Sequence, residues 1–191
     1  MKCVRLREYI EQLNAQTHSS LRDPTFQQYL TSHSVDFEDI VGFSRFRHDT
    51  FARNLISRTP LYELLLLAWL PGQSAPPQDC GGQVSWVGVA SGRLNLQTYQ
   101  RKLGRLGELL ALGGATCNEP GQVQRIDGSE LIHEFRNISS IPALSLHLNI
   151  GPTDTCLEYD SVTRNFISAE LWSFPPPPET QWIEAHPEPL E

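Results

Sequence analysis

The sequence has no apolar run that approaches the ~20 residues needed to cross a lipid bilayer, so no transmembrane helix is predicted. It also lacks an apolar segment at its start, where MKCVRLREYIEQ carries charges in place of the hydrophobic region of a signal peptide. Secretion by that route is therefore not expected. We predict a cytoplasmic protein that does not use a membrane as a partner.

Closely spaced cysteine pairs and a basic charge balance are also absent. The four cysteines, Cys3, Cys80, Cys117 and Cys156, form no CxxC motif, which is typical of reduced thiols rather than of a disulfide framework. The net charge of -7 argues against nucleic acid as a partner. Five acidic residues lie beyond Arg164 with no Lys or Arg among them, so the rest of the chain is nearly neutral.

What the sequence does contain is enough apolar material for one folded core. It has 191 residues, a hydrophobic fraction of 39%, four tryptophans and eight phenylalanines, which favours a single domain with short appendages. We predict a helical N-terminal segment over 1–57, a β-barrel over 58–173 on which it packs, and a Pro-rich acidic tail over 174–191. Monomer and homo-oligomer both stay open.

Helical and strand patterns follow one another along the chain. Apolar residues at helical spacing predict a helix over 4–15, and Asp23-Pro24 predicts the start of a second. From Leu61 the pattern becomes a series of short strands, with a Pro/Gly-rich loop over 71–82 and a hairpin turn at Ser91-Gly92. Residues 105–130 fit either short strands or a helix fragment, and we favour strands. The pattern predicts a mainly β chain whose larger part is a closed barrel or jelly roll.

Two motifs with characteristic spacing lie within the predicted barrel. In the first, Gly72 is followed after five residues by Gln78-Asp79-Cys80, after four more by Ser85, and after six more by Gly92. This spacing resembles the first signature of the cupin superfamily, which has a His-x-His pair where Gln78 and Cys80 stand and a glutamate where Ser85 stands. The second motif is His133-Glu-Phe-Arg-Asn137, a histidine with an asparagine after three intervening residues.

The sequence that flanks these motifs is more specific. Phe51-Ala52-Arg53-Asn54-Leu55 matches the segment that holds the substrate carboxylate in one cupin family, and Trp69 matches a tryptophan before the first motif. Further matches are Asn137-Ile138-Ser139, Pro142-Ala143, Ser145-Leu146-His147-Leu148 and Asp154-Thr155-Cys156. From about Phe51 to Asp160 the chain therefore resembles the cysteine dioxygenase family.

The resemblance implies a cupin β-barrel (jelly roll) with an N-terminal helical segment, iron(II) as cofactor and a small carboxylate or thiol as ligand. In that family three neutral imidazoles leave iron positions open for the substrate thiolate, its amine and dioxygen. Carried onto this sequence, the family's positions are Gln78, Cys80 and His133 for the metal, Arg53, Phe51 and Trp69 for the substrate, and Ser145, His147 and Asn149 for the catalytic hydrogen-bond network.

Several of these positions differ from the family's pattern. A glutamine carbonyl is a weak ligand for iron, and a Cys80 thiolate favours zinc or copper(I). Strand alternation would place Gln78 and Cys80 on one face and Asp79 on the other. Ser85 replaces the cysteine that some members crosslink, and Phe51 and Asn149 replace tyrosines, so no thioether cofactor can form. The cofactor is therefore iron(II), another metal or none.

Ordinary structural roles compete with each of these assignments. Arg53 could pair with a nearby acid such as Asp49, and His133 could be a satisfied interior histidine. Ser145, His147 and Asn149 could bond only one another on the inner face of a strand. Cys80 could be a plain loop cysteine, since no histidine is near it in sequence.

Three functions follow. The first is a cysteine dioxygenase-like cupin with altered or lost metal-dependent thiol oxidation, which binds a small carboxylate, such as an amino acid, through Arg53. The second is an active iron-dependent dioxygenase that converts cysteine or a related small thiol to its sulfinate. The third is a non-enzymatic interaction scaffold whose Pro-rich tail contacts a partner.

Overall fold

The computed structural model describes residues 2–104, 107–128 and 131–178, without the side chains of Cys80 and of residues 103–109. Most of the predicted Pro-rich tail, residues 179–191, lies outside this description. Within the described part of the chain, no helix is both long and apolar enough to cross a membrane.

Helices dominate the first 41 residues. The elements are β1 (Lys2–Val4), α1 (Leu6–Asn14), α2 (His18–Arg22), α3 (Phe26–Ser32), β2 (His33–Val35) and α4 (Phe37–Val41). Helix α1 buries one face, as its apolar spacing predicts, and a capping box between Thr17 and Ser20 starts α2. The parallel pair β1–β2 was not predicted, because strands of three residues are too short to show a period of two.

The rest of the described chain is mainly β. Its elements are β3 (Ala52–Arg58), β4 (Tyr62–Trp69), the 3₁₀ helix η1 (Cys80–Gly82), β5 (Val84–Ser91), β6 (Leu94–Gly104), β7 (Gly107–Asn118), β8 (Val123–Asp127), β9 (Ile132–Asn137), β10 (Ala143–Ile150), β11 (Thr155–Asp160) and β12 (Asn165–Glu170). The preference for strands between 105 and 130 is confirmed by β7 and β8. Residues 52–57, which we assigned to the helical segment, instead form β3. Polar residues on both of its faces hid the alternation there.

The central sheet has the strand order β3-β4-β10-β5-β8 and two buried faces. One face, with Leu64, Leu66 and Trp86, packs against the helices α1 to α4. The other face, with Leu65, Leu67 and Trp69, looks into the barrel. This explains why β4 is buried at every position and shows no alternation in its sequence.

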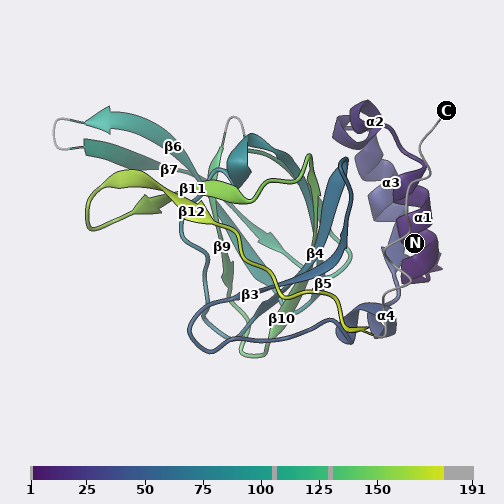
Figure 1. The fold of residues 1–191 in the computed structure, drawn as a ribbon. Helices are drawn as coiled ribbons and strands as arrows, with labels where there is room; N and C mark the ends of the chain where they lie inside the picture. Colours follow the sequence, from purple (N-terminus) through teal and green to yellow (C-terminus); the bar gives the residue numbers. More distant parts are fainter. Residues whose placement is uncertain (1, 105–106, 129–130, 179–191) are drawn as a thin grey trace.

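The second wall of the barrel is built from the sheet β7-β6-β9 and the hairpin β11–β12. Residues 73–78 join this sheet to the hairpin. The Gln78 N–H donates to the His133 carbonyl at 2.9 Å, and the Tyr159 N–H donates to the Pro77 carbonyl at 2.8 Å. The predicted loop over 71–82 is thus partly extended chain. Figure 1 shows the helices on one side of this barrel and the hairpins β6–β7 and β11–β12 on the other. The mainly β jelly roll with an N-terminal helical segment is confirmed.

Candidate functional site

A small cavity of about 30 Å³ lies inside the barrel. Seven of the nine predicted site residues line it: Phe51, Arg53, Trp69, Gln78, His133, His147 and Asn149. Ser145 lies fully buried next to them, bonded to His147. Cys80 begins η1, and its side chain lies outside the described residues. The space accommodates about one or two water molecules, since one water needs ~10–15 Å³.

Arg53, on β3, meets a carboxylate of the protein at one end of this cavity. Its Nη2 donates to Glu63 Oε2 on the neighbouring strand β4 at 3.2 Å, and its Nε donates to Ser173 Oγ at 3.3 Å. The two charged side chains are only 12% and 5% exposed. Asp49, the partner we considered from sequence, pairs with Arg47 instead. The buried guanidinium therefore already has an anion without any ligand.

Asn149 extends this ion pair across the sheet. The register places it directly opposite Glu63 on β4 and Ser85 on β5. Asn149 Nδ2 donates to Glu63 Oε2 at 3.3 Å, and Ser85 Oγ donates to Asn149 Oδ1 at 2.7 Å. Both the nitrogen and the oxygen of the Asn149 amide thus form hydrogen bonds within the protein. The family resemblance implies a tyrosine at this position, with its hydroxyl facing the substrate.

A second chain of hydrogen bonds joins the indole of Trp69, the hydroxyl of Ser145 and the imidazole of His147. Trp69 Nε1 donates to Ser145 Oγ at 3.0 Å, and Ser145 Oγ lies 2.9 Å from His147 Nε2. Burial lowers the pKa of His147 to about 3, with further lowering from the positive charge of Arg53 and from His133. The ring is therefore neutral at neutral pH, and its Nε2 accepts from the Ser145 hydroxyl or donates to it according to the tautomer.

The predicted metal positions Gln78 and His133 face each other across two backbone hydrogen bonds of 2.9 Å. The Cys156 thiol donates to Gln78 Oε1 at 3.5 Å, and burial lowers the pKa of His133 to about 4. The strand alternation we assumed over 78–80 is wrong beyond Asp79. There η1 begins, and Asp79 Oδ1 accepts from the N–H groups of Gly81 and Leu157 at 2.7 and 3.0 Å.

The family resemblance implies iron(II), and the metal-ligating atoms present determine whether it fits this site. His133 offers one neutral imidazole, and Gln78 offers an amide oxygen that already accepts a thiol hydrogen bond. Among the described side chains, no group of three or more His, Cys, Asp or Glu could hold a metal ion. His133 and Gln78 by themselves do not fit iron(II), which needs three protein donors on one face. The ligand set with Cys80 stays a prediction from sequence.

Aromatic rings fill much of the site. Phe51 stacks on Trp69 with 4.6 Å between ring centroids and 15° between planes. Phe135 packs edge to face against both His133 and His147, at 5.6 and 5.4 Å. This apolar ring therefore lies against both buried histidines.

Two site residues were missed by the sequence analysis, namely Glu63 and Phe135. A usable signal was present for each. Glu63 is the only charged residue of β4 and shares the phase of Trp69, which points it into the barrel. Phe135 lies two residues after His133 on β9, so it shares the inner face of that strand.

Comparison with known proteins agrees with this architecture. The sequence model of the family described as "Cysteine dioxygenase type I" matches residues 4–162. Cysteine dioxygenase type 1 of Danio rerio is 24% identical over 178 residues, which is 91% of this chain and 89% of the relative. The human protein of the same name is 24% identical over 139 residues, 72% of this chain and 69% of its own length.

Among solved structures, TT1209 from Thermus thermophilus superimposes with a TM-score of 0.46 and 23% identity. The alignment covers 59% of this chain and 94% of that protein. The family assignment rests on the sequence matches, which extend from the N-terminal helices to the hairpin β11–β12. The chain therefore belongs to the cysteine dioxygenase family.

Proposed function

We propose that this protein is a cysteine dioxygenase-family cupin that has lost metal-dependent thiol oxidation and whose barrel site is closed by its own carboxylate. The observation that carries the proposal is the ion pair between Arg53 and Glu63, with 3.2 Å between Nη2 and Oε2. The family resemblance implies that the arginine at this position binds the carboxylate of the substrate. Here Glu63 takes the place of that carboxylate.

A ligand carboxylate would have to displace Glu63 from Arg53. The displaced Glu63 would then be a buried anion beside a second anion, an arrangement that strongly disfavours the charged form of one of them. Arg58 Nη1, at 3.9 Å from Glu63 Oε1, adds a further cationic neighbour that stabilises Glu63 in place. We therefore revise the expectation of a small-carboxylate pocket: the carboxylate that pairs with Arg53 belongs to Glu63 and not to a ligand.

The metal end of the site supports the same proposal. One imidazole, one amide and one cysteine stand where the resemblance implies three imidazoles, and the Phe135 ring lies against both buried histidines. The cavity of about 30 Å³ is also too small for cysteine beside a metal and dioxygen. Without a bound metal, a thiol in this barrel has nothing that activates dioxygen toward its sulfur.

The test is reconstitution with iron(II) under anaerobic conditions, followed by metal analysis and oxygen-electrode measurements with cysteine and 3-mercaptopropionate. Cysteine dioxygenase type 1 of Danio rerio, treated in parallel, is the positive control. We expect far less than one iron per chain and no oxygen uptake above that of free iron(II). Stoichiometric iron together with thiol-dependent oxygen uptake would show that the protein is an active dioxygenase and would overturn the proposal.

A further inference from the structure

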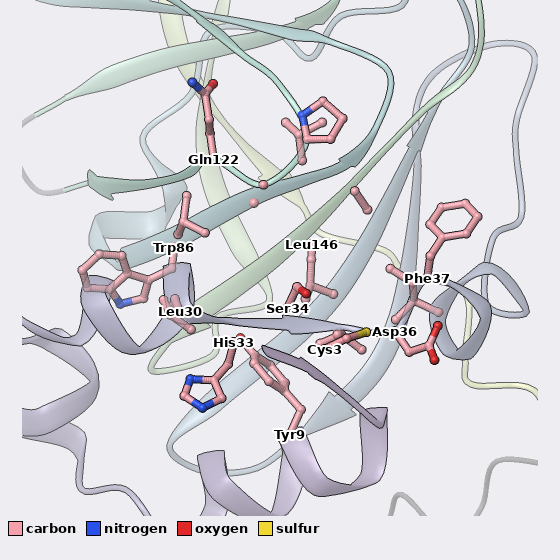
Figure 2. Close-up of a pocket in the computed structure, with 18 of the residues that line it drawn as sticks. Cys3, Tyr9, Leu30, His33, Ser34, Asp36, Phe37, Trp86, Gln122 and Leu146 are labelled. Carbon is pink, nitrogen blue, oxygen red and sulfur yellow. The ribbon is translucent and has the colours of Figure 1, made fainter. Parts of the chain in front are cut away.

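A second and much larger pocket lies outside the barrel, between the helical layer and the outer face of the central sheet. Its volume is about 470 Å³, within the ~300–1,000 Å³ typical of small-molecule sites. We call it the interlayer pocket. Figure 2 shows it with Tyr9, Leu30 and Phe37 from the helices, and with Trp86 and Leu146 from the sheet. It shares none of the catalytic, substrate or metal residues predicted from sequence.

The sequence of β5 explains why this space is not filled. Trp86, Gly88 and Ala90 alternate onto the outer face of the sheet, and the last two carry almost no side chain there. A Cβ atom at Gly88 would meet Val123 Cγ2 at 3.5 Å, which is ordinary contact, so glycine is not required by crowding. The small residues at positions 88 and 90 therefore leave this space open between the sheet and the helices.

The chemistry of the lining limits what the pocket could bind. Its walls are mainly aliphatic and aromatic, and the polar side chains among them include His33, Ser34, Asp36 and Gln122. Leu146, Val35 and Ala90 stay partly exposed at the edge of the buried core. Its one acidic side chain is Asp36, whose carboxylate lies 3.6 Å from Arg5 and accepts a hydrogen bond from the Glu38 N–H at 3.1 Å. No lysine or arginine is found among the described lining residues. The lining also contains His33, whose ring stacks on Tyr29 and whose Nδ1 lies 2.9 Å from Ser32 Oγ. An anionic ligand would therefore find no lysine or arginine in this lining to pair with.

We propose that the interlayer pocket binds a neutral apolar small molecule, with its ring or chain between Trp86 and the helices. Any polar group of such a molecule would lie toward the rim formed by Cys3 and Ser34, which sit opposite each other in the β1–β2 pair. Burial of apolar surface is the driving force, at roughly 25 cal/mol per Å². The site uses the opposite face of the sheet from the barrel cavity and does not depend on thiol chemistry.

The test uses the full chain and Nile red, a neutral dye whose emission strengthens and shifts to the blue in apolar surroundings. We expect saturable binding of one dye per chain, competed by 1-decanol and not by decanoate at equal concentration. Alkylation of the Cys3 thiol should also be slower when the dye is bound, measured against Cys3→Ser to remove the signal of the other cysteines. Equal competition by decanoate would contradict the proposed neutral ligand class.

Two variants fill the pocket independently, Ala90→Leu and Gly88→Leu, and each should weaken dye binding by about tenfold or more. The matched control is Ala115→Leu, a small-to-large change at an exposed strand position outside the pocket. Circular dichroism identifies any variant that does not fold. If one filling variant is unfolded, the dye affinity of the other shows whether filling the pocket weakens binding. Unchanged dye affinity in a folded filling variant, or no saturable binding by the wild-type chain, would overturn the proposal.

Discussion

Arg53 and Glu63 form a buried ion pair on the adjacent strands β3 and β4, with 3.2 Å between Nη2 and Oε2. Each side chain lines the barrel cavity, and Asn149 ties the same carboxylate oxygen to the next strand. The pair thus neutralises a guanidinium that would otherwise attract an anionic ligand. Its removal should both destabilise the protein and create a new anion site.

Replacing Glu63 with alanine should lower the free energy of unfolding by about 3–5 kcal/mol, because it leaves a buried guanidinium without its carboxylate. It should also make the protein respond to small carboxylates. Propionate or 3-mercaptopropionate at a hundredfold excess over its dissociation constant should then restore about 2.7 kcal/mol. Urea denaturation with and without the carboxylate measures both effects.

The isosteric variant Glu63→Gln is the control for this experiment. It removes the charge but keeps the volume, so it should be destabilised and show a much smaller response to propionate. The wild-type chain should show none. A wild-type protein that is stabilised by propionate as strongly as Glu63→Ala would mean that Glu63 does not close the site.

A second prediction concerns the metal positions. The double variant Gln78→His with Cys80→His supplies imidazoles at the two positions where the resemblance implies them, and it should bind iron(II) at least about tenfold more tightly than the wild type. Thiol oxidation should still be absent, because Arg53 remains paired with Glu63. Anaerobic iron titration and oxygen uptake measure the two outcomes. The matched control is Gln78→Asn with Cys80→Ser, which changes the same positions without adding imidazoles and should bind no more iron than the wild type.

The two buried histidines predict a pH dependence of stability. Burial lowers the pKa of His133 to about 4 and that of His147 to about 3, against 6.5 for an ordinary histidine. Below pH 6.5 both histidines bind protons in the unfolded chain but stay neutral in the folded chain. The free energy of unfolding therefore falls as the pH decreases. For the two histidines together the loss between pH 7 and 5 is about 3–4 kcal/mol.

Urea denaturation at pH 7, 6 and 5 tests this slope. His133→Gln and His147→Gln should each remove about half of it, whatever their effect on stability at pH 7. The control is His48→Gln, at an exposed position, which should leave the slope unchanged. An unaltered slope in both buried variants would show that these histidines are not the source of the acid sensitivity.

A further prediction concerns the hydroxyl between Trp69 and His147. Ser145→Ala should cost about 1–3 kcal/mol, because the buried indole N–H and the imidazole nitrogen both lose their partner. Thermal denaturation measures the loss, and near-ultraviolet circular dichroism should report a change around Trp69. Ser168→Ala, on the exposed hairpin β11–β12, should stay within about 0.5 kcal/mol of the wild type.

The sequence alone was sufficient for the fold class and for seven of the residues that line the barrel cavity. Helix α1 follows from its apolar spacing, and the short strands from their alternation. The family resemblance in turn indicates Arg53, Trp69, His133 and His147 as neighbours, and all four lie around one cavity. The start of β3 was misjudged because its inner face carries Arg53 and its outer face Asn54, so neither face looks apolar.

Only the tertiary structure determined which of those residues interact with one another. The sequence shows an arginine and, ten residues later, a glutamate, and it does not state whether they meet. The register of β3 against β4 and the long reach of the arginine side chain bring them together inside the barrel. Likewise, the interlayer pocket depends on how the helices lie over Gly88 and Ala90, which is a matter of packing between distant segments. Local patterns determine which elements form, whereas long-range packing determines which charges are matched and which spaces stay empty.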